Sequence, residues 1–507
     1  MMISRVSKKS ATQFMRTLAS FTPAKPLHAR DLNKQTIEAK YAVRGRIPIR
    51  AEEIKHHLQT NPESHGFKFD KIINANIGNP QQLDQKPLTW YRQVLSVLQY
   101  PDILESEELS KSYPKDVLTR AKNILSSTGS IGAYSHSQGD QYIRKSVAKF
   151  ISQRDGHPAN ANDIFLTAGA SSAVSYLLQI LSVDKNSGFL IPIPQYPLYT
   201  ASIALNDAKP IGYFLDESNN WSTNPEEIRS LIKENSEKGI DIKCLVVINP
   251  GNPTGSVLEK EDIKELIDIA AEFGIVLIAD EVYQENIFQG EFISFKKVLS
   301  ELVIARPDLY SNVQLASLHS TSKGFSGECG QRGGYMELSG FTDGFKNVML
   351  KLASINLSPV VSGQALMELM INPPKQGDES YAVYKQEVDE IYSALKERSE
   401  LLYNAFTTMT DVTCNKPQGA MYLFPRLHFN KHGYARLFQE AQDLGVEIDE
   451  FYCIQLLENT GICCVPGSGF GQVKDTYHLR TTFLAPGTEW IENWRQFHEQ
   501  FIKSYKS

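Results

Sequence analysis

The sequence is poor in several features that mark particular classes of protein. Its longest apolar runs, such as Leu245–Ile248 and Ile275–Ala279, stay far below the ~18 to 20 residues that a membrane helix needs. There is no basic excess, because 52 Lys and Arg stand against 58 Asp and Glu, and the main body holds no Lys/Arg-rich tract suited to nucleic acid. We therefore expect a soluble protein without a membrane or nucleic-acid partner.

Cysteine is also scarce. The six cysteines of this 507-residue chain show no CxxC spacing, and a chain of this length needs no disulfide staples. We expect reduced thiols and no bound metal. The positions are Cys244, Cys329, Cys414, Cys453, Cys463 and Cys464. Cys329 lies in a glycine-rich segment near Lys323, where we expect it to pack rather than react.

Short apolar runs alternate with helical stretches from about Asp163 onward. This alternation predicts a mostly parallel sheet covered by helices on both faces. In such a sheet a ligand binds at the carboxyl ends of the strands. The expected strands are Ile164–Thr167, Gly188–Ile193, Leu245–Ile248 and Ile275–Ala279, and the expected helices include Ala173–Leu181 and Lys260–Phe273.

The length of the chain, with 41% hydrophobic residues, predicts more than one domain. A segment rich in Pro, Gly and charge, Asn372–Glu379, precedes a long helical pattern from about Tyr384 to Thr407. We expect that helix to lead into a second, smaller α+β domain that ends near Tyr505.

The first thirty residues differ from the rest. They carry basic residues such as Arg5 and Arg16 among Ser and Thr, and no acidic residue occurs before Asp31. On a helix the apolar and basic residues of this segment separate onto opposite sides. The pattern is typical of a mitochondrial transit peptide and favours the mitochondrial matrix. The alternative is a basic tail on a cytoplasmic protein.

One lysine stands among small residues, in Ser320-Thr321-Ser322-Lys323-Gly324, and Arg332 follows nine positions later in a glycine-rich stretch. A lysine amine can condense with an aldehyde, and nearby hydroxyls and a guanidinium can hold a phosphate. The pattern favours pyridoxal phosphate as a cofactor, joined to Lys323 and held by Ser320 and Arg332. The alternative is an exposed lysine in a Gly/Ser loop.

A second phosphate signal follows the expected strand Ile164–Thr167. There Gly169-Ala170-Ser171-Ser172 opens a helix, and the free backbone N–H groups of a helix start bind anions. We expect Ala170, Ser171 and Ser172 to contribute to the phosphate site. Two serines before an apolar run are also an ordinary helix cap.

Two further side chains follow expected strands. Asp280 comes directly after Ile275–Ala279, so its carboxylate lies near a buried site and needs a cation, which the pyridinium nitrogen supplies. Tyr196 follows Gly188–Ile193, and we expect it to stack on the pyridine ring. The alternatives are a helix-capping aspartate and a core tyrosine.

From about Lys40 to its C-terminus the chain resembles the alanine aminotransferases, within the fold-type I aminotransferase superfamily. The resemblance also extends to the lysine segment. The motifs that carry it are Tyr41-Ala42-Val43-Arg44-Gly45, Asn76-Ile77-Gly78-Asn79-Pro80, Gly132-Ala133-Tyr134-Ser135, Asn249 to Gly255, Gly419-Ala420-Met421-Tyr422 and Tyr477-His478-Leu479-Arg480.

The resemblance implies a fold-type I pyridoxal phosphate transferase. This is an α/β fold with a large domain, whose mostly parallel sheet is sandwiched by helices, plus a smaller α+β domain. The expected division is a transit peptide (1–30), an N-terminal arm with part of the small domain (31–105), the large cofactor-binding domain (106–380) and the small C-terminal domain (381–507).

The resemblance also implies roles around the cofactor. Asn252 and Tyr283 bond the ring hydroxyl, and Tyr134 reaches a phosphate across a dimer interface, so the active species is a homodimer. The expected catalytic residues are Lys323, Asp280 and Tyr196. The expected cofactor-binding residues are Ala170, Ser171, Ser172, Tyr196, Asn252, Asp280, Tyr283, Ser320, Lys323, Arg332 and Tyr134.

On the substrate side, Arg480 matches the arginine that receives the α-carboxylate, and its planar fork suits a carboxylate. By the same resemblance we expect the backbone around Gly78 to close over this group, and Asn252 is also an expected substrate-binding residue. Arg44 and Arg50 are candidates for the distal carboxylate of glutamate, although each taken singly fits a surface role better.

The implied reaction is transamination of L-alanine with 2-oxoglutarate to pyruvate and L-glutamate in a ping-pong cycle. Lys323 first holds the cofactor and then acts as the base. One alternative is a catalytically silent paralogue that binds pyridoxal phosphate and serves as a regulator or scaffold. Another is an aminotransferase of this fold with a different amino-acid preference. The intact set of site residues argues against the silent paralogue.

Overall fold

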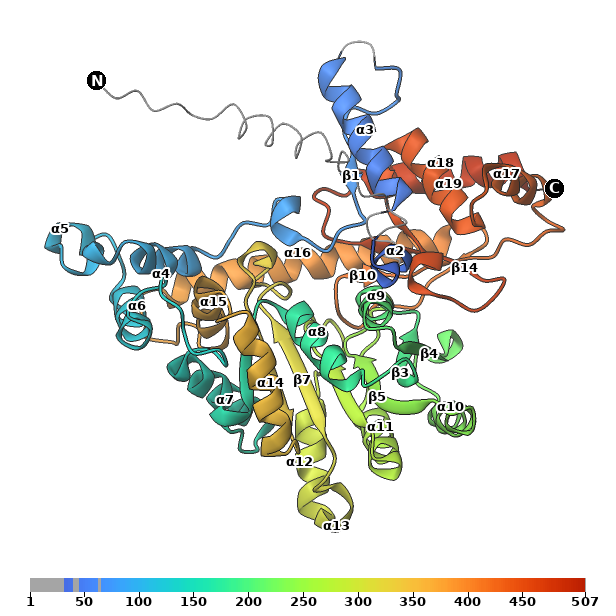
Figure 1. Ribbon diagram of the computed structural model, residues 1–507. Coiled ribbons are helices and arrows are strands. Elements are labelled where there is room, and N and C mark those ends of the chain that lie inside the picture. Colours follow the sequence, from blue (N-terminus) through green and yellow to red (C-terminus); the bar gives the residue numbers. More distant parts are fainter. Residues whose placement is uncertain (1–31, 40–44, 63–64, 507) are drawn as a thin grey trace, which may run out of the picture.

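The computed structural model describes residues 32–39, 45–62 and 65–506. The expected transit peptide 1–30 and Arg44 lie outside the described residues. The described chain forms two sheet-containing units joined by the long helix α16 (Tyr381–Thr408), which confirms the helix expected near Tyr384–Thr407 (Figure 1). Among the described helices, none combines the length and apolarity needed to cross a membrane.

The larger unit is built on a seven-stranded sheet. In spatial order its strands are β2 (Ile164–Thr167), β8 (Gly334–Ser339), β7 (Leu315–Ser320), β6 (Val276–Asp280), β5 (Asp241–Ile248), β3 (Ser187–Ile193) and β4 (Lys209–Phe214). β8 pairs antiparallel with β2 and β7, and the remaining neighbours pair in parallel. The mostly parallel sheet is confirmed, and the four expected strands match β2, β3, β5 and β6.

The sheet separates two hydrophobic cores because successive residues of a strand point to opposite faces. In β5, Cys244 and Val246 belong to one core, whereas Leu245 and Val247 belong to the other. Helices accordingly cover both faces (Figure 1). On the first face lie α8 (Ala170–Leu181), α9 (Leu198–Leu205) and α14 (Asp343–Ile355), and on the second α10 (Pro225–Glu237), α11 (Lys260–Phe273) and α12 (Phe295–Ala305).

A third core joins α4 (Thr89–Gln99) to the larger unit. It contains Trp90 and Val94 of α4, Val117 of α6 (Lys115–Thr128) and Met367 of α15 (Val361–Ile371). The division of the chain at residues 30, 105 and 380 stays a prediction. Among the described residues, the other α-helices outside the smaller unit are α2 (Lys34–Glu38), α5 (Glu107–Ser110), α6 (Lys115–Thr128), α7 (Gln141–Asp155), α13 (Pro307–Tyr310) and α15 (Val361–Ile371).

The smaller unit takes residues from both ends of the described chain. β1 (Ile73–Asn74) pairs in parallel with β12 (Ile462–Cys463), and α3 (Arg46–Thr60) lies beside α18 (Ile448–Thr460) (Figure 1). An antiparallel sheet completes the expected α+β unit. It consists of β10 (Tyr422–Leu423), β14 (Tyr477–Thr482), β11 (Arg426–Leu427) and β9 (Val412–Thr413), with β13 (Val465–Pro466) on β14 and with helices α17 (Ala435–Leu444) and α19 (Glu489–Tyr505).

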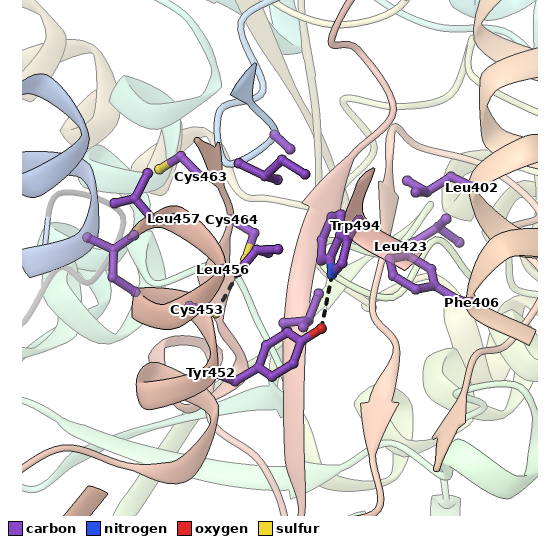
Figure 2. Packing of buried hydrophobic residues seen from close by; sticks show 14 of the residues in the cluster. Leu402, Phe406, Leu423, Tyr452, Cys453, Leu456, Leu457, Cys463, Cys464 and Trp494 are labelled. Carbon is purple, nitrogen blue, oxygen red and sulfur yellow. Dashed lines mark hydrogen bonds between the residues drawn. The ribbon is translucent and has the colours of Figure 1, made fainter. Parts of the chain in front are cut away.

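Figure 2 shows the core of the smaller unit. The indole of Trp494 from α19 packs edge-on against Phe406 of α16, with ring centroids 5.2 Å apart, and its Nε1 donates to Tyr452 Oη at 3.1 Å. Cys453 and Cys464 face each other with their sulfurs 3.3 Å apart. The six cysteines are free thiols, as expected.

Candidate active site

A cavity of about 250 Å³ opens where the carboxyl ends of β5, β6 and β7 meet the smaller unit. This is the position that the sheet topology predicts for a ligand. Of the expected catalytic, cofactor-binding and α-carboxylate-binding residues, all but Ser172 and Tyr134 line it. The lining residues are Ile77, Gly78, Asn79, Ala170, Ser171, Tyr196, Leu198, Ile248, Asn252, Asp280, Val282, Tyr283, Ser320, Ser322, Lys323, Cys329, Arg332, Tyr422 and Arg480.

Lys323 enters the cavity from the loop that follows β7. Its side chain is half-buried, and Nζ donates to the backbone oxygen of Gly78 at 2.7 Å. Cys329 lies beside it, and its Sγ donates to the backbone oxygen of Ser322 at 3.0 Å. The loop therefore presents one amine to the cavity and holds it by a hydrogen bond.

Asp280 is the last residue of β6 and is 6% exposed. Tyr199 Oη donates to its Oδ2 at 2.9 Å, while Oδ1 is buried without a side-chain partner among the described residues. Burial raises the pKa of Asp280 to about 6, against the hydrogen bonds from Tyr199 and the backbone of Val282. A buried carboxylate with one unused oxygen is a site for a cation.

The N-terminus of α8 and Arg332 lie together at one side of the cavity. Arg332 Nη2 donates to Ser171 Oγ at 3.1 Å and to the backbone oxygen of Ala168 at 3.0 Å. A Cβ at Gly169, where φ is 78°, would lie 2.3 Å from Nη2, so only glycine allows this approach. Helix N–H groups, hydroxyls and a guanidinium form an anion site.

Two of the predicted phosphate-site residues, Ser320 and Ser172, donate hydrogen bonds from their hydroxyls to residues close by in the sequence. Ser320 Oγ donates to Ser322 Oγ at 3.0 Å and lies at the cavity. Ser172 Oγ donates to the backbone oxygen of Ala168, just before α8, at 3.2 Å, and is not part of the lining. Its role at the phosphate stays a prediction.

Arg480 of β14 is 2% exposed at the opposite side of the cavity. Its Nη1 donates to Asn252 Oδ1 at 3.2 Å and its Nη2 to the backbone oxygen of Asn76 at 2.6 Å. The guanidinium lies between the rings of Tyr422 and Phe470, 4.5 and 4.7 Å from their centroids. Within the described part of the chain its Nε has no hydrogen-bond partner. Arg480 thus offers a buried donor to an anionic ligand.

The amide of Asn252 links Arg480 to two tyrosines. Its Nδ2 donates to Tyr283 Oη at 3.4 Å, and Tyr283 Oη lies 3.0 Å from Tyr422 Oη. Asn252 and Tyr283 are therefore hydrogen-bonded to each other, and their predicted contact with one ligand group stays a prediction.

Sequence reasoning did not identify Tyr199 and Tyr422 as site residues. Tyr199 stands three positions after Tyr196, and the start of α9 at Leu198 turns its hydroxyl toward Asp280. Tyr422 belongs to the motif Gly419-Ala420-Met421-Tyr422. That motif could have identified Tyr422 as a site residue. Nothing in the sequence around Tyr199 indicates that it hydrogen-bonds Asp280.

Like Ser172, the predicted residues Tyr134 and Arg50 do not line the cavity. Tyr134 is 78% exposed, so in a single chain it cannot contribute to the site. Arg50 Nε donates to Glu458 Oε1 of α18 at 2.6 Å and its Nη1 to Glu53 Oε2 of α3 at 3.1 Å. Arg50 is thus already engaged by two carboxylates.

Comparison with known proteins agrees with this fold. The model for the family "Aminotransferase class I and II" matches residues 104–490. The chain is 56% identical over 493 residues to "Alanine aminotransferase, mitochondrial" of Saccharomyces cerevisiae, covering 96% of this chain and 82% of the relative. It is also 54% identical over 494 residues to "Inactive alanine aminotransferase" of the same organism, covering 96% of each.

Among solved structures, the alanine aminotransferase from Pyrococcus furiosus superposes with a TM-score of 0.71. At 24% identity, over 93% of this chain and 100% of that one, it shows the fold alone. The fold is therefore that of a fold-type I aminotransferase. The chain belongs to the family of class I and II aminotransferases, on the evidence of the family match and of relatives more than half identical over nearly the full length.

Gly78→Ala is expected to lower the free energy of unfolding by about 1 to 3 kcal/mol because the added methyl group overpacks the site. A Cβ at Gly78 would lie 2.2 Å from Tyr422 Oη and 3.2 Å from Lys323 Nζ. Urea unfolding measures the loss. The matched control is Gly330→Ala, where the added Cβ meets nothing within 4 Å. Tyr422→Phe should restore part of the loss in the double variant. Equal stabilities of the Gly78 and Gly330 variants would contradict the expected clash.

Proposed function

We propose that this chain transfers the amino group of L-alanine to 2-oxoglutarate, with pyridoxal phosphate as cofactor, and releases pyruvate and L-glutamate in a ping-pong cycle. One observation carries the proposal. A lysine amine, a buried carboxylate with an unused oxygen and a buried arginine with an unused donor line one cavity at the strand ends. The similarity to a relative named alanine aminotransferase supports the choice of substrate.

The residues present fit the cofactor that the family implies. The anion site of α8, Ser171 and Arg332 suits its phosphate, and the unpaired Oδ1 of Asp280 suits its ring nitrogen. Asn252 and Tyr283 suit the ring hydroxyl, while Tyr196 lies at the cavity for the ring face. Pyridoxal phosphate, when bound, supplies an aldehyde for the amino group and a ring that withdraws electrons from the α-carbon.

Residues of the chain itself bind the substrate, move the proton and balance the charge of the cofactor ring. Arg480 binds the α-carboxylate of the substrate, and its hydrogen bonds to Asn252 and Asn76 fix the direction of its fork. Lys323 Nζ is the base that takes the proton from the α-carbon. Asp280 stays ionised opposite a cation and so keeps positive charge on the ring nitrogen. The surrounding rings of Tyr422 and Phe470 hold the arginine away from water.

A silent paralogue is the second candidate, because the chain is nearly as similar to an inactive relative as to an active one. The purified protein should be incubated with pyridoxal phosphate, alanine and 2-oxoglutarate while pyruvate and the cofactor spectrum are followed together. With both substrates present we expect continuous turnover. With alanine alone we expect only the first half-reaction, which forms one pyruvate per bound cofactor. A spectral change on cofactor uptake without pyruvate would favour the silent paralogue. Faster turnover with aspartate or aromatic amino acids would redirect the substrate assignment.

The assembly and location belong to the same proposal. Tyr134, 78% exposed here, is proposed to reach the phosphate of a second copy in a homodimer. The relative named mitochondrial supports import by residues 1–30. Sedimentation of the purified protein tests the dimer. Fusion of residues 1–30 to a fluorescent protein tests the import against the cytoplasmic alternative.

A further inference from the structure

A loop of the larger unit reaches across to the smaller unit close to Arg480. The loop is Asp216–Ser222, between β4 and α10, and it closes on itself because Asp216 N donates to Ser222 O at 2.9 Å and Trp221 N donates to Asp216 O at 2.7 Å. Asn220 and Trp221 have φ values of 52° and 62°, a conformation that L-residues rarely adopt. Such a conformation persists where surrounding contacts over-determine it.

The polar contacts of the loop converge on Glu217. Its Oε2 accepts from Arg426 Nη1 at 3.1 Å and lies 3.3 Å from His478 Nε2. Arg426 and His478 are directly opposed across β11 and β14, so this carboxylate faces both strands, hydrogen-bonded to Arg426 and within ion-pair distance of His478. Burial raises the pKa of Glu217, but His478 and Arg426 outweigh it and hold the pKa below its usual value, so the group is ionised at neutral pH.

Two hydrogen bonds from side-chain amides reinforce this crossing. Asn415 Nδ2 donates to the backbone oxygen of Glu217 at 3.0 Å, and Asn220 Nδ2 donates to Gln418 Oε1 at 2.7 Å. The loop is therefore bonded to the segment before β10 as well as to the strands.

The apolar contacts of the loop lead toward the active site. Trp221 is 4% exposed and packs edge-on against Phe424, with centroids 5.7 Å apart, while Phe424 stacks on His478 at 4.8 Å. Phe424 in turn meets Phe470 at 6.0 Å, and Phe470 lies under the guanidinium of Arg480. A continuous series of packed rings thus joins the loop to the arginine.

The position of the Arg480 side chain depends on how the larger and smaller units are placed relative to each other. It stands two residues after His478 on β14, hence on the same face of the strand, and it hydrogen-bonds Asn252 of the larger unit. We propose that Glu217 and Trp221 form a latch with His478, Arg426 and Phe424, and that this latch positions Arg480 for the substrate carboxylate. The proposal rests on the carboxylate-binding role given to Arg480 under the proposed function.

The test compares Glu217→Ala and Glu217→Gln with the wild-type holoenzyme. The matched control is Glu226→Gln, an acid on neighbouring α10 whose side chain is 83% exposed and paired with Arg229. We expect KM for alanine and for 2-oxoglutarate to rise about tenfold in Glu217→Ala and less in Glu217→Gln, which keeps a hydrogen-bonding side chain. We expect kcat to change less than twofold, and the control to match the wild type.

Propionate separates positioning from general loosening of the fold. It has the carboxylate of alanine but no amino group, so its dissociation constant can be measured by calorimetry with and without cofactor. We expect weaker binding in Glu217→Ala under both conditions. If wild type and Glu217→Ala bind propionate equally, even when the variant has a lower melting temperature, the latch proposal is wrong. The carboxylate-binding role of Arg480 would then still stand. No binding to the wild type would remove the role of Arg480, and the latch with it.

Coupling to Arg480 gives the decisive comparison. On an Arg480→Lys background, whose KM is already raised, Glu217→Ala is expected to add less than a twofold further increase, because the group that the latch positions is gone. Independent, multiplicative increases in the double variant would show that Glu217 acts elsewhere.

Discussion

Lys323→Ala is expected to lower kcat for transamination by at least about a thousandfold, because the variant lacks both the amine that joins the cofactor and the base at the α-carbon. The amine lies 2.7 Å from the backbone oxygen of Gly78 inside the cavity, and no second lysine lines that cavity among the described residues. Pyruvate formation and the absorbance of lysine-bound cofactor are expected to disappear together.

The control for this variant is Lys122→Ala, which removes an exposed lysine of α6. Added methylamine should restore part of the turnover of Lys323→Ala, because truncation leaves space for a small amine beside Gly78. Lys323→Arg should not be rescued, since its side chain fills that space. Full turnover of Lys323→Ala without added methylamine would contradict the catalytic role of Lys323.

Asp280→Asn is expected to lower kcat/KM by about two to three powers of ten, since it leaves a buried ring cation without its counter-charge. Without cofactor the same change should be stabilising. Burial raises the pKa of Asp280 to about 6, above its unfolded value of 3.8, so the folded protein holds more protons between those values. Stability is therefore lost as pH rises through that window, by about 3 kcal/mol when the loss is complete above pH 6.

Thermal unfolding at several pH values measures this effect. In the wild type, the increase in melting temperature caused by pyridoxal phosphate should grow between pH 5 and pH 7.5, roughly the range in which the carboxyl becomes fully charged. In Asp280→Asn it should stay flat. Burial also raises the pKa values of three other carboxyl groups, Asp449, Glu281 and Glu285. These groups titrate in both proteins, so their effect cancels when the wild type is compared with Asp280→Asn. A parallel pH dependence in the two proteins would contradict a charged contact at Asp280.

The large sheet and the residues at its strand ends were predictable because their signals are local. The expected helix Lys260–Phe273 matches α11 in both limits, since Glu259 and Asp262 cap its start and Gly274, with φ of 64°, ends it. Asp280 and Lys323 follow apolar runs that are readable as buried strands. Their convergence follows from the parallel topology, which brings the strand ends to one edge.

Contacts between the two units were not predictable in the same way. Glu217 and His478 meet only because a loop after β4 crosses to β14, and neither sits in a pattern that names the other. The hydrogen bond from Tyr199 to Asp280 likewise depends on where α9 begins. The pairing of β1 with β12 joins distant segments of two residues each, too short for periodicity to identify.

That last pairing has a consequence for synthesis of the protein. The smaller unit needs Ile73 and Asn74 early in the chain and Ile462 and Cys463 near its end, so it cannot close until the chain has been synthesised through β12. Its apolar surface stays available to chaperones until translation is nearly finished.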